Sequence, residues 1–254
     1  MNAAFGTRYD NSLMKEKPKM QFLLHAMLIL CMAYVLADLY WPLQRDLRRF
    51  DPAELAKRET RMWQSYYDHR HVALLLQLAA MLRDQYHFPL LRSYLGAFHA
   101  TTAAFIFKGG ENRIDYEKAL PALQRYFKLI RRTGNLAFDV HRTARLELEW
   151  WIVHREHARH SDTELGQACA DAAASLYTIA ANATYRHGLL RARAMLMLDA
   201  RAASGNVEPA DWTAIEALLC ESYRELNRVA AKKVPLRAVI TDNAPVCLAS
   251  PAAG

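Results

Sequence analysis

Acidic and imidazole side chains interrupt helical faces that are otherwise apolar. Stripes at helical spacing run over residues 55–80, 95–106 and 140–158 and consist mostly of aliphatic and aromatic residues. Because such a stripe marks the side that a helix buries, charged residues within it are expected to point into the interior. The interrupting residues are Glu59, His69, His99, Glu147 and His154.

Carboxylates and imidazoles that meet inside a helical bundle can hold two iron or manganese ions, because carboxylate oxygens bridge the ions and imidazoles complete the ligand shell. The chain would then be a metal-dependent oxidoreductase with a di-iron or other divalent metal cofactor. However, the usual Glu-x-x-His pairs are missing. Glu147 and His154 are seven residues apart, which is about 10 Å along a helix axis.

We therefore favour a different interpretation of these residues. A buried carboxylate needs a partner, so we expect Glu59 and Glu147 to face one interior and to pair with Arg or Tyr side chains in a structural network without a cofactor. The metal site is kept as the alternative.

A second histidine pattern has a spacing of three residues: His154, His157 and His160. Imidazoles at this spacing can share a zinc or copper ion. The third residue, however, is turned away from the first, and histidines at the end of a helix interact favourably with its dipole. We interpret the pattern as a surface cluster.

Familiar catalytic motifs are absent from the sequence. It contains no Gly-rich phosphate loop, no Gly-x-Ser-x-Gly, no His-Glu-x-x-His and no haem attachment motif. The net charge of +7, from 33 Lys and Arg against 26 Asp and Glu, is spread along the chain. Without a nucleic-acid-binding motif, this charge predicts a solvated basic surface and no nucleic-acid partner.

Helices must position the candidate residues. Nine Gly and nine Pro in 254 residues are few, and long apolar-periodic segments separate them, which predicts an all-α protein. The short connections favour an antiparallel multi-helix bundle. The expected helices span residues 52–86, 89–106, 115–133 with a kink at Pro121, 140–159, 162–181, 184–203 and 209–230.

The clearest boundaries are capping motifs. Asp51 can cap a helix that begins at Pro52, and Ser161 with Glu164 forms a capping box. Gly134 follows a cationic last turn and is a stop signal.

The eighteen residues from Met20 to Ala37 carry no formal charge. A helix needs about 20 apolar residues to cross a bilayer, and Tyr40 and Trp41 follow where interfacial aromatics are expected. Asp38 and the polar residues near the start shorten the strictly apolar run to residues 26–37, a length that a core helix also has. We interpret the segment as an uncleaved, single-pass membrane anchor, because a convincing cleavage site is missing.

The cysteines bear on which side of the membrane the body lies. Cys31, Cys169, Cys220 and Cys247 are far apart and form no Cys-x-x-Cys motif, so we expect them to be reduced. Reduced thiols favour the cytoplasmic side. Lys and Arg residues before and after the anchor nearly cancel and do not decide the orientation.

Together these patterns predict four regions: a basic N-terminal tail (1–19), a membrane anchor (20–42), a helical bundle (43–231) and a disordered tail (232–254). The expected function is that of a membrane-associated accessory or scaffold protein that docks to a larger assembly. Its expected partners are the membrane and another protein.

Overall fold

A computed structural model describes residues 12–232, with side chains from residue 20 onward, and within this range the chain folds into helices. In the described part the one β-type contact is a single bridge between Arg45 and Gly134. The predicted all-α class is confirmed. The predicted C-terminal tail after residue 232 and residues 1–11 of the N-terminal tail lie outside the described residues, whereas residues 12–19 belong to a helix.

The described helices are α1 (Ser12–Tyr40), α2 (Pro52–Tyr67), α3 (His71–Tyr86), α4 (Leu90–Lys108), α5 (Arg113–Glu117), α6 (Leu120–Thr133), α7 (Val140–Arg155), α8 (Asp162–Tyr177), α9 (Ala181–Ala203) and α10 (Pro209–Ala230), with a 3₁₀ turn at His157–Arg159.

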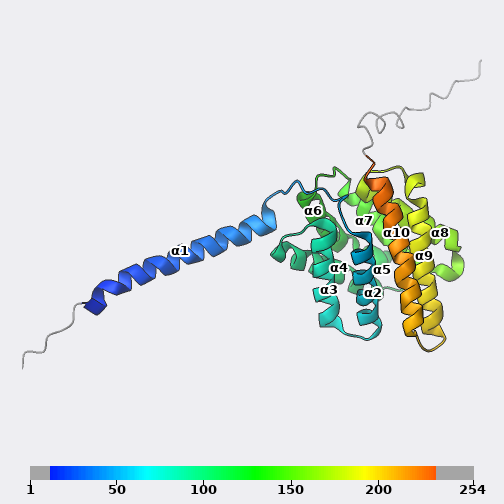
Figure 1. Ribbon diagram of the computed structural model, residues 1–254, viewed down its shortest axis with the longest axis horizontal. Helices are drawn as coiled ribbons and strands as arrows, with labels where there is room; N and C mark the ends of the chain where they lie inside the picture. The colour runs from blue at the N-terminus through cyan, green and yellow to red at the C-terminus, as the bar shows by residue number, and fades with distance from the viewer. Residues whose placement is uncertain (1–11, 233–254) are drawn as a thin grey trace, which may run out of the picture.

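The helices of the body form a closed cycle of contacts. Helix α2 packs on α3, α3 on α4, α4 on α6 and α6 on α7, and the order continues through α8 and α9 to α10, which returns to α2. The short helix α5 contacts α4 and α7. Helix α1 projects away from this body (Figure 1).

The capping motifs fix several boundaries where the sequence predicts them. The Asp51 carboxylate accepts hydrogen bonds from the backbone N–H groups of Ala53 and Glu54. Ser161 and Glu164 form the predicted capping box at the start of α8, and α10 covers residues 209–230 as expected. These boundaries depend on neighbouring residues alone.

The predicted helix 52–86 is wrong, because the chain turns between α2 and α3. His69 adopts a left-handed backbone conformation (φ 56°), and the Arg70 N–H bonds to the Ser65 carbonyl oxygen. An Asp68–Arg70 ion pair accompanies the turn. No glycine or proline marks the break, and the helical spacing of apolar residues continues through it, so the sequence predicts one long helix. Because of the turn, His69 does not lie on the same helical face as Glu59.

Several further boundaries differ from the expectation. Helix α8 ends at Tyr177, short of the expected residue 181, and α9 begins at Ala181 in place of residue 184. The predicted helix 115–133 is divided into α5 and α6, and Pro121 lies in the first turn of α6, where its missing N–H is harmless. Helix α7 ends at Arg155, short of the expected residue 159, and a 3₁₀ turn follows.

Helix α1 is almost entirely outside the body. Its segment Met20–Tyr40 is long and apolar enough to cross a membrane, and 6% of it is buried within the protein. Its side chains therefore do not form part of the core, and the segment is not a core helix in this structure.

The last turn of α1 is fastened to the body by Arg92, which is fully buried. The Arg92 guanidinium donates to the backbone oxygens of Asp38 and Trp41, both at 2.8 Å, and to Thr133 Oγ1 at 3.0 Å. In return the Asp38 carboxylate accepts from the N–H groups of Leu91 and Arg92 at the start of α4. These bonds join the end of α1 to α4 and α6.

Candidate functional site

The cycle of helices encloses a cavity of about 140 Å³. Seven helices line it: α2, α3, α6, α7, α8, α9 and α10. Its polar lining consists of Glu59, Gln85, Tyr86, Tyr126, Glu147, Cys169, Tyr177, His187, Arg191 and Tyr223.

Glu59 is buried and fully engaged by partners from distant parts of the chain. Arg191 donates two hydrogen bonds to its carboxylate, at 3.0 and 2.6 Å. The Tyr223 hydroxyl donates a third at 2.6 Å. The Arg191 guanidinium also lies over the Trp150 ring, 5.6 Å from its centroid. This is the Arg and Tyr pairing that a structural network requires.

Close packing of α8 and α9 brings Arg191 to this position. A Cβ atom on Gly188 would lie 2.0 Å from the Gly166 carbonyl oxygen, so only glycine lets the two backbones approach. Thr184 Oγ1 adds a hydrogen bond to the Ala170 carbonyl oxygen at 2.9 Å. The interior face of α9 is thereby held against the cavity.

Glu147 lines the same cavity but has a different environment. The Trp151 indole N–H donates to its carboxylate at 3.2 Å. Within the described residues it makes no ion pair with Lys or Arg. Burial, with the nearby Glu59 charge as a smaller contribution, raises the pKa of Glu147. The expected pairing of Glu147 with Arg or Tyr is therefore wrong, because its hydrogen-bond donor is a Trp indole. One cavity holds an ion-paired carboxylate, Glu59, and a carboxylate without an ion-pair partner, Glu147.

The thiol and phenol groups of the cavity are held in their neutral forms. Burial raises the pKa of the Cys169 thiol to about 12, and it raises the pKa of Tyr86 and Tyr126 as well. A thiol or hydroxyl that keeps its proton is a poor nucleophile. These groups are suited to packing and hydrogen bonding.

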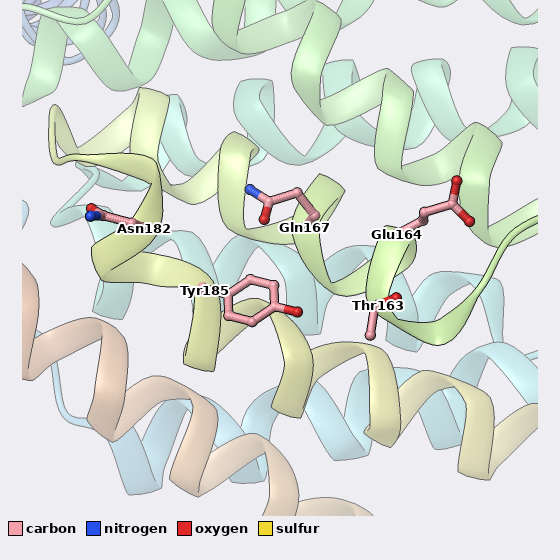
Figure 2. Close-up of a pocket in the computed structure, with 5 residues that line it drawn as sticks. All are labelled: Thr163, Glu164, Gln167, Asn182 and Tyr185. Atoms are coloured by element: carbon pink, nitrogen blue, oxygen red, sulfur yellow. The ribbon is translucent and has the colours of Figure 1, made fainter.

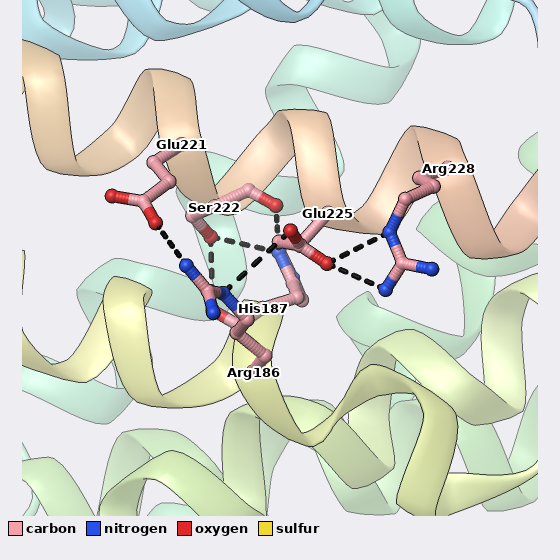
Figure 3. A network of polar contacts seen from close by, with 6 residues as sticks. All are labelled: Arg186, His187, Glu221, Ser222, Glu225 and Arg228. Atoms are coloured by element: carbon pink, nitrogen blue, oxygen red, sulfur yellow. Dashed lines mark hydrogen bonds and ion pairs between the residues drawn. The ribbon is translucent and has the colours of Figure 1, made fainter.

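His187 is also neutral, because burial lowers its pKa to about 4. Its Nδ1 lies 3.0 Å from the Ser222 carbonyl oxygen and 2.7 Å from Ser222 Oγ, which in turn donates to the His187 carbonyl oxygen. Figure 3 shows this buried contact between α9 and α10 beside the ion pairs of Arg186 and Arg228.

The structure brings together only part of the predicted metal-ligand set. Glu59 and Glu147 line one cavity, as expected, whereas His69, His99 and His154 do not line it. His154 Nε2 instead lies 2.8 Å from Asp199 Oδ2. Among the residues that the structure describes, no three His, Cys, Asp or Glu side chains are grouped so that they could hold a metal ion.

The histidines of the second pattern have separate contacts. His157 Nδ1 lies 3.1 Å from the His154 carbonyl oxygen, and His160 is 3.7 Å from Glu164. They form the interactions of a helix end, in keeping with the interpretation as a surface cluster.

Arg191 and His187 were missed by the sequence analysis. They are four residues apart on α9 and interrupt a face of Leu, Ala and Met residues. The sequence signal that marks them is the same as for Glu59 and Glu147: each is a polar residue within an otherwise apolar helical stripe, here over residues 184–203.

A second depression lies on the surface between the starts of α8 and α9. Figure 2 shows its lining residues, Thr163, Glu164, Gln167, Asn182 and Tyr185. The depression has a volume of about 500 Å³. Its one carboxylate, Glu164, is already used by the capping box. The lining offers hydrogen-bonding groups but no arrangement typical of catalysis.

Compared with known protein families, curated proteins and solved structures, the chain matches none of them.

Proposed function

We propose that this chain is a membrane-anchored accessory protein, in which α1 crosses the bilayer once and holds the helical body at its surface as part of a larger assembly. The observation that carries the proposal is the exposure of four consecutive residues, Met27 to Leu30, at 58–70%. Successive helix residues are 100° apart, so these four surround the helix. An amphipathic helix that docks in a groove is apolar on one side only, whereas lipid solvates every side.

The ends of the apolar segment support the same proposal. Tyr40 and Trp41 are exposed at its C-terminal end, where aromatic side chains favour the membrane interface. The first charged residue after Met20 is Asp38, and its carboxylate is bonded to the body. The body would therefore lie directly against the bilayer.

The interior supports a structural role for the body. The strongest charges in the cavity, Glu59 and Arg191, neutralise each other, and Tyr86, Tyr126 and Cys169 keep their protons. We further propose antiparallel packing of neighbouring helices and a cytoplasmic location of the body, the latter supported by the free thiols of Cys31, Cys169 and Cys220.

Alkaline extraction of membranes tests the anchor. The full chain should stay in the membrane pellet, and its intact mass should show that α1 is retained rather than cleaved as a signal. The Leu28→Arg/Ile29→Arg variant should move to the soluble fraction with an unchanged helical signal, because two central charges are costly in a bilayer. The control Leu28→Ile/Ile29→Leu should remain in the pellet. Soluble wild-type protein, or loss of α1 by cleavage, would contradict the proposal.

A further inference from the structure

Helices α3 and α4 expose an apolar surface on the body, called here the α3–α4 face: Val72, Leu76, Tyr94, Phe98 and Phe105. These side chains are 41–75% exposed. Residues 94, 98 and 105 share one side of α4, and residues 72 and 76 share one side of α3. The two helices pack together, and the His71 and Phe105 rings are 6.4 Å apart. The two rows therefore belong to one continuous surface.

The α3–α4 face lacks the charges that normally solvate a protein surface. No Asp, Glu, Lys or Arg occurs from residue 72 to 82 in α3 or from residue 93 to 107 in α4. Large apolar patches of this kind on a soluble protein mark an interaction site.

The position of this face indicates what it contacts. Figure 1 shows α3 and α4 on the side of the body from which α1 projects, with their axes running across the direction of α1. The connection is direct, because the Asp38 carboxylate at the end of α1 binds the first N–H groups of α4. A bilayer crossed by α1 would therefore lie against α3 and α4.

A row of four cations lies on the outer side of α6: Arg125, Lys128, Arg131 and Arg132. All are exposed, and within the described residues none forms an ion pair with a carboxylate. Helix α6 packs on α4, and burial together with the Arg125 charge lowers the pKa of His99 on α4. At the other end of the row, Arg132 lies over the Tyr40 ring of α1, 5.7 Å from its centroid.

We propose that the α3–α4 face and the α6 cations bind the surface of an anionic bilayer, with the aromatic side chains in the headgroup region and the cations against lipid phosphates. This inference rests on the proposed anchor, which brings the body to the membrane. Apolar side chains bordered by Lys and Arg are typical of interfacial membrane binding. A second copy or a protein partner would explain the apolar face but not its continuity with both α1 and the cation row.

Spin labelling of the full chain in vesicles tests this contact. A nitroxide is placed at Phe98→Cys on the face, or at the exposed control Ala217→Cys on α10, in a background with Cys31, Cys220 and Cys247 replaced by Ser. The vesicles contain phosphatidylcholine with phosphatidylglycerol. Collisions with oxygen, which concentrates in lipid, are compared with collisions with a water-soluble nickel chelate.

We expect the ratio of oxygen to nickel collisions to be several-fold higher at position 98 than at 217. The Lys128→Gln/Arg132→Gln variant should lower this ratio at position 98. Vesicles that float with the chain while position 98 behaves like 217 would overturn the inference and leave the anchor intact. Shielding of position 98 from both reagents would also overturn it, because a protein surface would then cover the face. A chain that does not float with the vesicles would overturn both proposals.

Discussion

Two helix pairs of the same body have outer surfaces of different chemical character, one charged and the other apolar. Helices α9 and α10 are joined across their outer side by ion pairs, with Arg186 contacting Glu221 and Glu225 and Arg201 contacting Asp211 (Figure 3 shows the first of these). Helices α3 and α4 also pack on each other but expose Tyr94, Phe98 and other apolar side chains. Since both pairs belong to one cycle of helices, packing alone does not explain the difference.

Each outer surface matches its surroundings. Water solvates the charges of the α9–α10 pair, whereas the apolar surface of the α3–α4 pair lies beside α1, where we propose the bilayer. Helices α9 and α10 also supply the polar contacts of the interior. Arg191 of α9 and Tyr223 of α10 both donate hydrogen bonds to Glu59 of α2.

The largest expected effect comes from breaking the interior anchor of the α9–α10 side. Glu59→Gln leaves the Arg191 charge buried without a counter-charge, so we expect the free energy of unfolding to fall by about 3–5 kcal/mol. Urea denaturation followed by circular dichroism measures the change. Metal analysis of the wild-type protein and of three variants, Glu59→Ala, Glu147→Ala and His154→Ala, accompanies this measurement. If the wild-type protein held about one or two ions per chain and each variant lost them, the result would contradict the structural network and favour the metal site.

Glu147→Gln is the matched control for this substitution. The folded-state pKa of Glu147 in the wild-type protein is raised, so ionisation of this residue destabilises the protein as the pH rises above the unfolded pKa. We expect the neutral amide to maintain or increase the stability at neutral pH. A loss as large as that of Glu59→Gln would show that the two carboxylates are not distinguished by their partners.

Acid should loosen the α9–α10 contact at His187. The folded-state pKa of about 4 lies below the unfolded value, so between the two the unfolded chain binds more protons. The stabilisation is complete above the unfolded pKa and is lost as the pH falls towards 4, up to about 3 kcal/mol. Urea midpoints measured against pH should show this loss, and His187→Asn should flatten it. An unchanged slope in that variant would refute the assignment.

A smaller effect is expected where α8 and α9 approach each other. Gly188→Ala places a Cβ against the Gly166 backbone, and overpacking of this kind costs about 1–3 kcal/mol. Gly109→Ala is the matched control, since a Cβ there would meet no atom closer than 3.6 Å. Thermal melts of the two variants should separate them. Equal melting temperatures would show that the helices can move apart freely.

The smallest effects on stability are expected at the two outer surfaces. Arg228→Ala removes an exposed ion pair with Glu225, which should cost less than about 1 kcal/mol. Phe98→Ser should change the stability by a similarly small amount, within about 0.5 kcal/mol. In anionic vesicles it should also lower the oxygen-to-nickel collision ratio of a nitroxide at Phe105→Cys on the same side of α4, a ratio that Arg228→Ala should leave unchanged. If both variants lowered this ratio equally, the two surfaces would not differ in the proposed way.

Local signals made much of the fold predictable. The caps at Asp51 and Ser161 and the bounds of α10 depend on residues within one helical turn. The turn at His69 could not be found this way, because it is stabilised by the packing of α3 on α2 and carries no glycine or proline.

The site was predictable in part for the same reason. Helical spacing indicated that Glu59 and Glu147 face the interior, and both line the cavity. It did not identify Arg191, 132 residues from Glu59 in sequence, as the partner. That pairing depends on the way the cycle of helices closes, which local patterns do not encode.

The most direct test of the account uses a native reporter in α1. Cys31 is exposed in the structure and lies near the middle of the Met20–Tyr40 segment. In intact membranes containing the full chain with Cys220 and Cys247 replaced by Ser, a membrane-impermeant maleimide should label Ala217→Cys on α10 after the membranes are opened by freezing and thawing. It should leave Cys31 unlabelled until the bilayer is dissolved in detergent. Labelling of Cys31 as fast as position 217, with the bilayer present, would contradict the claim that α1 spans the membrane.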